Sequence, residues 1–365
     1  MTQNHCFPKP YWHNCCIKKS GIDRLKCESL KMKMNRAIYL GYYLKKLDRE
    51  KFRVFLNHAS KLTGKPRTAI LSDVVRSVFT YNISILEYFQ FGFFDLSQKE
   101  REQWAGTGYM YEYQLRMNPR NDRHILEDKT LFYKHYGDFF VHRVADIETI
   151  KNQPEIADEI LANPSGRLVF KSAEGNCGTD VEIKRCSDFN RASILDFMEK
   201  RGFPLVEEFI EQHPQLNRLS PSAVNTVRIF TQLDDRNEVV ILGCRLRISV
   251  NSPVDNMAAG NLAAPIDETT GQLSGPAVYS DITKEVQECH PVTKVKIPGF
   301  QIPYWEETLE MVKKAALHRP QNRSIGWDVV ITEKGPGLIE GNHDWCKLLW
   351  QLPVRRGMKS ALKEF

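Results

Sequence analysis

Three oxygen-bearing residues near the C-terminus have the types and spacing of a metal site. Asp328 begins one short apolar run, Glu340 lies near the end of a second, and the turn-forming residues 333–337 separate the two runs. This pattern is typical of a β-hairpin, and a turn centred near Lys334 would place Asp328 opposite Glu340, with their Cβ atoms about 5 Å apart. Because side chains alternate along a strand, Asn342 would share that face. Such oxygen ligands suit Mg²⁺, although a solvated surface with chance carboxylates fits the same residues.

A second pattern is a lysine followed by a glycine-rich loop. Lys171 ends an apolar, strand-like run, and the loop after it contains Glu174, Gly175, Gly178 and Thr179. Glycines allow backbone N–H groups to approach a phosphate closely, and a lysine beside them adds a point charge. The loop is neither a Walker loop nor a dinucleotide fingerprint, and an ordinary hairpin turn would also explain it.

Two further patterns flank this loop in the sequence. Asp128 and Lys129 read as the start of a helix with basic residues on one side, which a salt-bridged surface helix would also explain. The strand-like segment 205–211 carries the adjacent carboxylates Glu207 and Glu208. The edge of such a strand can offer backbone groups to a purine and a carboxylate to ribose hydroxyls.

Composition predicts a soluble protein with a substantial core. At 365 residues the chain is long enough for about two or three subdomains. Its hydrophobic content of 42% and charged content of 26% are ordinary, and no uninterrupted apolar run predicts a transmembrane helix. The first twenty residues lack the apolar core of a signal peptide. The nine cysteines are then expected to be reduced thiols of a cytoplasmic protein.

Charge is unevenly distributed along the chain. Residues 1–70 carry 16 Lys and Arg against 4 Asp and Glu, whereas the whole chain has a net charge of +6. The basic segment therefore predicts an anionic partner, such as nucleic acid, an anionic membrane face or a pyrophosphate-linked substrate. A solvated basic surface on helices is the alternative.

The secondary structure expected to position these residues differs between the N-terminal part of the chain and the rest. Residues 1–30 read as an irregular basic arm, and residues 31–124 are mainly helical, with Ser97 and Glu100 at the spacing of a capping box. From about residue 125, short strand-like runs alternate with helices, which is typical of an α+β fold. The segment 251–264, rich in small residues and amides, is either a substrate-facing loop or a plain surface loop.

Taken in order, the four patterns resemble the ATP-grasp superfamily over roughly residues 125–350. Within that superfamily the chain most resembles the sugar-transfer-associated ATP-grasp proteins, which are found among polysaccharide biosynthesis functions. The aromatic segment 91–97 and the segment 225–229 carry this narrower similarity.

The resemblance implies two α+β subdomains, residues 125–204 and 205–365, that enclose ATP together with one or two Mg²⁺ ions, preceded by the basic helical region. It also implies a role for each pattern. Lys129, Lys171 and the loop residues Glu174, Gly175, Gly178 and Thr179 would contact the phosphates of ATP. Glu207, Glu208 and Ile210 would contact the adenine and the ribose. Asp328, Glu340 and Asn342 would bind Mg²⁺.

The sequence departs from many ATP-grasp ligases directly after the metal residues. Those ligases carry an arginine shortly after the Glu-x-Asn motif, whereas this chain has His343 followed by Asp344. A positive group for an acyl phosphate is therefore expected from Arg228, Arg245 or Arg247. His343 is a candidate base on the amine side of the reaction, or a support for Asn342.

The expected reaction is the ATP-dependent joining of a carboxylate to an amine through an acyl phosphate. The subgroup resemblance implies a sugar acid or an amino acid, free or glycan-linked, in polysaccharide or cell-surface glycan biosynthesis. A kinase on the same fold, which would phosphorylate a hydroxyl, and a non-catalytic nucleotide-binding protein are the alternatives. We do not expect nucleic acid as a partner. We do expect a peripheral contact between the basic N-terminus and the inner face of an anionic membrane.

Overall fold

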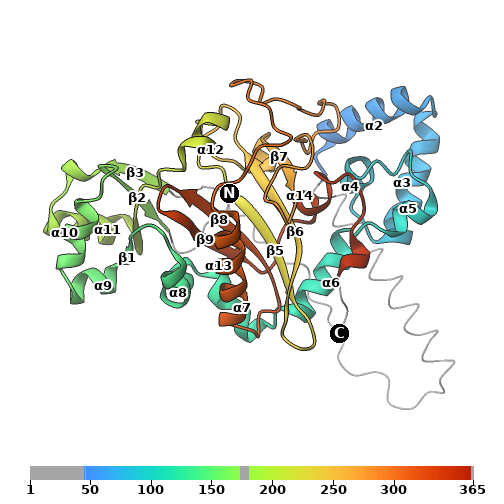
Figure 1. The fold of residues 1–365 in the computed structure, drawn as a ribbon. Coiled ribbons are helices and arrows are strands. Elements are labelled where there is room, and N and C mark those ends of the chain that lie inside the picture. The colour runs from blue at the N-terminus through green and yellow to red at the C-terminus, as the bar shows by residue number, and fades with distance from the viewer. Residues whose placement is uncertain (1–44, 46, 173–180, 363–365) are drawn as a thin grey trace, which may run out of the picture.

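The computed structural model describes residues 45, 47–172 and 181–362. The predicted arm 1–30 and the loop residues Glu174, Gly175, Gly178 and Thr179 lie outside this part of the chain. The described residues form two antiparallel sheets with helices packed against them, which confirms the expected α+β class (Figure 1). Within the same residues, no helix is both long and apolar enough to cross a membrane.

The described part of the region before the sheets is mainly helical, as predicted. Its capping boxes are both present, with Glu87 on Ser84 and Glu100 on Ser97. Aromatic side chains fill its core, and the ring of Phe91 stacks on Trp104 with 4.4 Å between centroids. Its helices are α2 (Arg49–Thr63), α3 (Arg67–Tyr81), α4 (Ile85–Gln90), α5 (Gln98–Glu102), α6 (Thr107–Met117), α7 (Arg120–Glu127) and α8 (Lys129–Tyr136), followed by the 3₁₀ turn η1 (Gly137–Phe139).

The first sheet has four strands in the order β1-β4-β2-β3. Leu168, Phe170 and Val206 pack on the helices that cover one face, so that period-2 alternation turns Lys171 and Glu207 to the opposite face. Its elements are β1 (Val144–Asp146), α9 (Ile147–Asn152), α10 (Glu155–Leu161), β2 (Arg167–Lys171), β3 (Val181–Arg185), η2 (Cys186–Asp188), α11 (Arg191–Arg201) and β4 (Leu205–Glu208).

The second sheet has five strands in the order β7-β6-β5-β8-β9. Ile229 and Trp327 point to a core shared with α8, α12 and α13, whereas Phe230 and Leu242 point to the core that holds the N-terminal helices and α14. Its elements are α12 (Pro214–Leu219), β5 (Val227–Leu233), β6 (Val239–Ile248), η3 (Met257–Ala259), β7 (Leu262–Ile266), α13 (Trp305–His318), β8 (Ser324–Thr332), β9 (Gly335–Asn342), α14 (Lys347–Gln351) and η4 (Lys359–Ala361).

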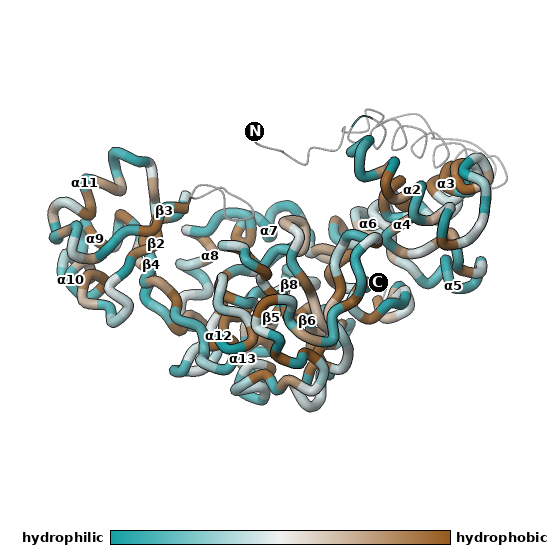
Figure 2. Tube along the Cα trace, turned by 90° about the horizontal axis from the view of Figure 1, so that it is seen from above, coloured by the Kyte–Doolittle hydropathy of each residue, from teal (hydrophilic) through white to brown (hydrophobic). Residues whose placement is uncertain are grey.

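The five-stranded sheet lies between the four-stranded sheet and helices α2–α5, as two perpendicular views show (Figures 1 and 2). Helix α6 joins the N-terminal helices to the sheet: Tyr113 Oη donates to Gln232 Oε1 at 2.8 Å, and Asn118 Nδ2 donates to the carbonyl of His343 at 3.0 Å. The proposed domain boundaries stay predictions. A boundary between residues 204 and 205 would divide the first sheet, because β4 begins at Leu205 and pairs with β1 and β2.

Candidate functional site

The predicted pairing of Asp328 with Glu340 in the C-terminal hairpin is confirmed, and a bulge produces it. Residues 333–334 form a two-residue turn between β8 and β9. Regular pairing from this turn would set Asp328 opposite Ile339, but the register shifts between Asp328 and Val329 and pairs Asp328 with Glu340 instead. One extra residue in β9 therefore brings the two carboxyl groups onto one face of the sheet.

Asp328 lies at the centre of a buried cluster of charges. Both of its oxygens accept from Arg228, with Nη2 at 2.8 Å from Oδ2, and Oδ2 also accepts from Arg247 Nη1 at 3.0 Å. Burial opposes ionisation of Asp328, but the two guanidinium groups outweigh it and hold the pKa of Asp328 well below its usual range. Desolvation likewise opposes the charge of Arg228, but the Asp328 carboxylate outweighs it and raises the pKa of Arg228.

Glu340 and Asn342 complete the predicted metal residues. Asn342 Nδ2 donates to Glu340 Oε1 at 3.2 Å, so both side chains lie on the face that carries Asp328. Burial and the nearby negative charge of Asp328 raise the pKa of Glu340.

This donor set fits Mg²⁺ only if a ligand completes the coordination. Two carboxyl groups and an amide oxygen are hard oxygen donors that Mg²⁺ accepts, and Mg²⁺ commonly takes further ligands from phosphate and water. The described part of the chain holds no group of three or more His, Cys, Asp or Glu side chains placed to bind a metal by themselves.

Lys171 and Glu207 form a second buried charge pair on the four-stranded sheet. The Nζ atom of Lys171 lies 2.6 Å from Glu207 Oε2, and His142 Nε2 lies 3.3 Å from the same oxygen. Burial opposes the charge of Glu207, yet Lys171 and His142 together lower its pKa to about 2. The predicted phosphate lysine and the predicted hinge glutamate are thus neighbours in space, although 36 residues separate them in sequence.

The end of β4 connects the two sheets. Glu208 accepts from the backbone N–H of Arg143 at 3.2 Å, and its Oε1 lies 3.9 Å from Lys334 Nζ in the β8–β9 turn. Beyond the half-buried Ile210, the N–H of His213 donates to the carbonyl of Ile331 in β8 at 2.7 Å. The predicted adenine hinge therefore runs from the first sheet directly onto the hairpin of the second.

The junction of α7 and α8 places Lys129 near the end of β9. Asp128 caps α8, accepting from the N–H groups of Thr130 and Leu131, and Lys129 is the first residue of that helix, as predicted. His343, directly after Asn342, has its Nε2 atom 3.0 Å from Oε1 of Glu127, the last residue of α7. This contact holds the junction beside the end of β9.

Arg245 is engaged differently from the other two candidate arginines. Its Nε and Nη2 atoms donate to the carbonyl of Trp350 at 3.0 and 2.6 Å, and Nη1 donates to the carbonyl of Cys244 at 2.7 Å. Burial lowers the pKa of Arg245 to about 10. The guanidinium thus anchors the end of α14, whereas Arg228 and Arg247 both bind Asp328. The sequence predicted all three arginines as candidates, with Arg228 or Arg247 at the acyl phosphate, but it did not identify the partners His142 and Asp255.

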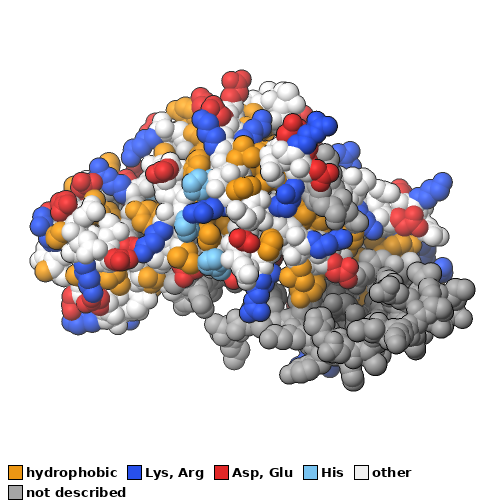
Figure 3. Space-filling model, turned by 90° about the horizontal axis from the view of Figure 1, so that it is seen from below, with side chains coloured by type: hydrophobic (Ala, Val, Ile, Leu, Met, Phe, Trp, Pro, Cys, Tyr) orange, Lys and Arg blue, Asp and Glu red, His pale blue; other side chains and the backbone are white. Residues whose placement is uncertain are grey.

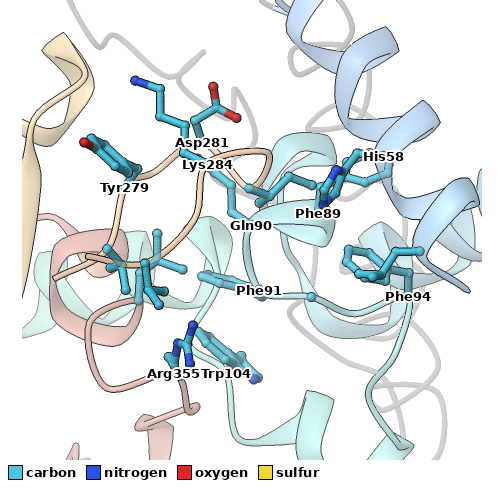
Figure 4. Close-up of a pocket in the computed structure, with 16 residues that line it drawn as sticks. His58, Phe89, Gln90, Phe91, Phe94, Trp104, Tyr279, Asp281, Lys284 and Arg355 are labelled. Atoms are coloured by element: carbon cyan, nitrogen blue, oxygen red, sulfur yellow. The ribbon is translucent and has the colours of Figure 1, made fainter. Parts of the chain in front are cut away.

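Two hollows in the structure lie apart from these side chains. One, of ≈ 250 Å³, is lined by Phe89, Phe91, Trp104, Tyr279 and Lys284, between the N-terminal helices and the segment 278–286 (Figure 4). The other, of ≈ 570 Å³, lies beside His213 and Tyr304. Neither is lined by a predicted nucleotide or metal residue, so the candidate site rests on side-chain geometry.

The family follows from a comparison with family models. A model described as sugar-transfer associated ATP-grasp matches residues 109–365, which is more than half of the chain. The protein therefore belongs to the ATP-grasp superfamily and, within it, to the sugar-transfer associated family. A search of curated proteins finds no match.

The solved structures that match this chain at low similarity include two enzymes. The biotin carboxylase domain of the Hydrogenobacter thermophilus 2-oxoglutarate carboxylase, solved with MgADP and bicarbonate, is 16% identical, with a TM-score of 0.36 over 64% of this chain and 46% of that one. The D-alanine–D-alanine ligase of Bacillus anthracis is 14% identical, with a TM-score of 0.30 over 60% and 57%. The chain spans about half the length of the solved structures it matches first.

Proposed function

We propose that this protein is an ATP-dependent ligase that joins a carboxylate to an amine through an acyl phosphate. The observation that carries the proposal is the cluster of Asp328, Glu340, Arg228 and Arg247 on one face of the sheet. It offers ligands for a phosphate-bound cation beside two guanidinium groups that suit carboxylate or phosphate oxygens. A site that only binds a nucleotide would not need the two guanidinium groups.

In this proposal the residues act mainly by positioning and by cancelling charge. Lys129 and Lys171 would bind phosphate oxygens of ATP, and the segment from Glu207 to Ile210 would hold the adenosine. Asp328, Glu340 and Asn342 would hold Mg²⁺, which when bound would offset the charge of the transferred phosphate. Arg228 and Arg247 would stabilise the oxyanions of the acyl phosphate and of the tetrahedral intermediate.

The contacts of His343 and Arg245 favour supporting roles for both residues. The contact of His343 Nε2 with the Glu127 carboxylate favours a role in holding Lys129 near the phosphates over a role as the amine-side base. The bonds of Arg245 to α14 favour a structural role over acyl phosphate binding. This leaves Arg228 and Arg247 as the arginines proposed to act on the substrate.

The substrate class and the location extend the same proposal. We propose a sugar acid or amino acid, free or glycan-linked, as the carboxylate substrate, in polysaccharide or cell-surface glycan biosynthesis; the description of the matching family, sugar-transfer associated, supports the link to sugars. We also propose a cytoplasmic protein whose basic N-terminal segment contacts an anionic membrane face. Among the described residues on the face drawn in Figure 3, basic and acidic side chains are interspersed.

The test is a screen for ADP release with paired carboxylates and amines in the presence of Mg²⁺. A ligase should release ADP and phosphate only with both substrates, and hydroxylamine should trap its acyl phosphate. Glu340→Ala should abolish most of the turnover, whereas the exposed Glu310→Ala, which loses only a surface pair with Lys314, should not. A stable phosphorylated product without phosphate release would instead identify a kinase.

A further inference from the structure

Asp255 links the candidate substrate loop to the metal residues. It lies in the first part, residues 251–261, of the segment 251–264 and is 6% exposed. Its Oδ1 is 2.6 Å from Arg247 Nη2, while its Oδ2 accepts from the N–H and the Oγ1 of Thr226 at 2.8 and 2.6 Å. Arg247 therefore bridges two carboxylates, Asp255 through one terminal nitrogen and Asp328 through the other.

The loop around Asp255 is held by its own hydrogen bonds. Asn261 Nδ2 donates to the carbonyls of Val254 and Asn256, at 2.7 and 3.1 Å, and Asn261 Oδ1 accepts from the N–H of Val250 at 2.8 Å. These bonds fix both ends of the segment. Asp255 is thus presented to Arg247 from a defined position.

The hydrogen bonds of Asp328 leave little room for a metal ion. A carboxylate has about four lone-pair sites, and Asp328 receives two hydrogen bonds from Arg228 and one from Arg247. The two bonds from Arg228 are bidentate, and a bidentate pair is stronger than a single hydrogen bond such as that from Arg247. For Asp328 to bind a cation, the single bond from Arg247 is the one released at least cost.

We propose that Asp255 is a positioning residue that keeps the Arg247 guanidinium next to Asp328 when Asp328 binds Mg²⁺. Held by Asp255 through Nη2, the guanidinium keeps a counter-charge, and its Nη1 is then available to an anionic oxygen of the substrate carboxylate or of its acyl phosphate. Without Asp255, the only carboxylate left to Arg247 among these contacts would be Asp328. Arg247 would then compete with the metal ion for the Asp328 carboxylate. This inference rests on the proposed function, because it takes Asp328 as a metal ligand.

The experiment measures Mn²⁺ affinity in the presence of ADP by electron paramagnetic resonance, with no turnover required. Asp255→Asn retains an oxygen for the Thr226 donors but loses the charge that holds Arg247. Its Mn²⁺ affinity should fall about tenfold, the lower end of what a hydrogen bond to a charged group contributes. In the Arg247→Met background, the same Asp255→Asn change should alter the affinity less than about twofold, because the competing cation is gone.

The control is Asp267→Asn, whose carboxylate bonds stay within the turn 267–270, and it should bind Mn²⁺ like wild type. If Asp255→Asn does not fold, Thr226→Val, which removes one donor to Asp255, should lower the affinity in the same direction. Wild-type affinity in the folded Asp255→Asn or Thr226→Val protein, or a tenfold loss that persists without Arg247, would overturn the inference. A wild-type protein that binds neither Mn²⁺ nor ADP would overturn the proposed function as well.

Discussion

Replacing Lys171 by Met should destabilise the protein by about 3 kcal/mol, in addition to weakening nucleotide binding. Lys171 Nζ lies 2.6 Å from Glu207 Oε2, and the side chain of Glu207 is only 7% exposed. Against the cost of burial, Lys171 and His142 lower the pKa of Glu207 from 4.5 to about 2, which corresponds to ~3 kcal/mol of stability at neutral pH. Removal of one partner from a buried ion pair typically lowers the stability of a protein by about 3–5 kcal/mol, which agrees with the value of ~3 kcal/mol.

The same reasoning predicts how the effect depends on pH. Because the pKa of Glu207 is lower in the folded protein than in the unfolded chain, its contribution is present above about pH 4.5 and is lost as the pH falls toward 2. In Lys171→Met the folded-state pKa of Glu207 rises, since burial is then opposed by less positive charge. The stability difference between wild type and variant should therefore shrink as the pH is lowered through this window.

Urea denaturation followed by circular dichroism measures the stability, and ADP binding is measured on the folded variants by calorimetry. The double variant Lys171→Met with Glu207→Leu should recover most of the lost stability, because neither charge is left buried alone, but it should not recover ADP binding. Lys200→Met, which removes an exposed pair with Asp196, is the matched control and should cost less than about 1 kcal/mol. A Lys171→Met protein as stable as this control, or a double variant less stable than the single one, would refute the reasoning.

Three further changes test other parts of the molecule. Gly326→Ala would place a Cβ atom 2.6 Å from Cβ of the buried Trp345, so the thermal midpoint should fall by the equivalent of about 1–3 kcal/mol, and an unchanged midpoint would contradict the packing. Asp328→Asn should raise the Mg²⁺ concentration needed for ADP release; an unaltered Mg²⁺ titration would count against metal ligation by Asp328. Deletion of residues 1–30 should weaken flotation with anionic vesicles, and equal flotation of both proteins removes the membrane contact.

The sequence alone determined the family and most of the local structure that carries the candidate site. Asp128 and Lys129 mark a helix start, Lys171 ends a strand, and a turn separates two apolar runs before Asn342; each of these signals lies within a few residues of the feature it predicts. Side-chain alternation with period 2 was enough to place Glu340 and Asn342 on one face. Local propensity and binary pattern are properties of short segments, so they can be read without the fold.

Only the tertiary structure decided what each charged group contacts. Arg245 and Arg247 are two residues apart on one face of β6, yet Arg245 binds the carbonyl of Trp350, and Arg247 binds Asp328 and Asp255. The cross-strand pairing of Asp328 with Glu340 likewise depends on a bulge that the turn alone does not specify. Such pairings join residues far apart in the chain, and they are selected by the packing of strands, loops and α14 and by the cost of leaving a buried charge without a partner.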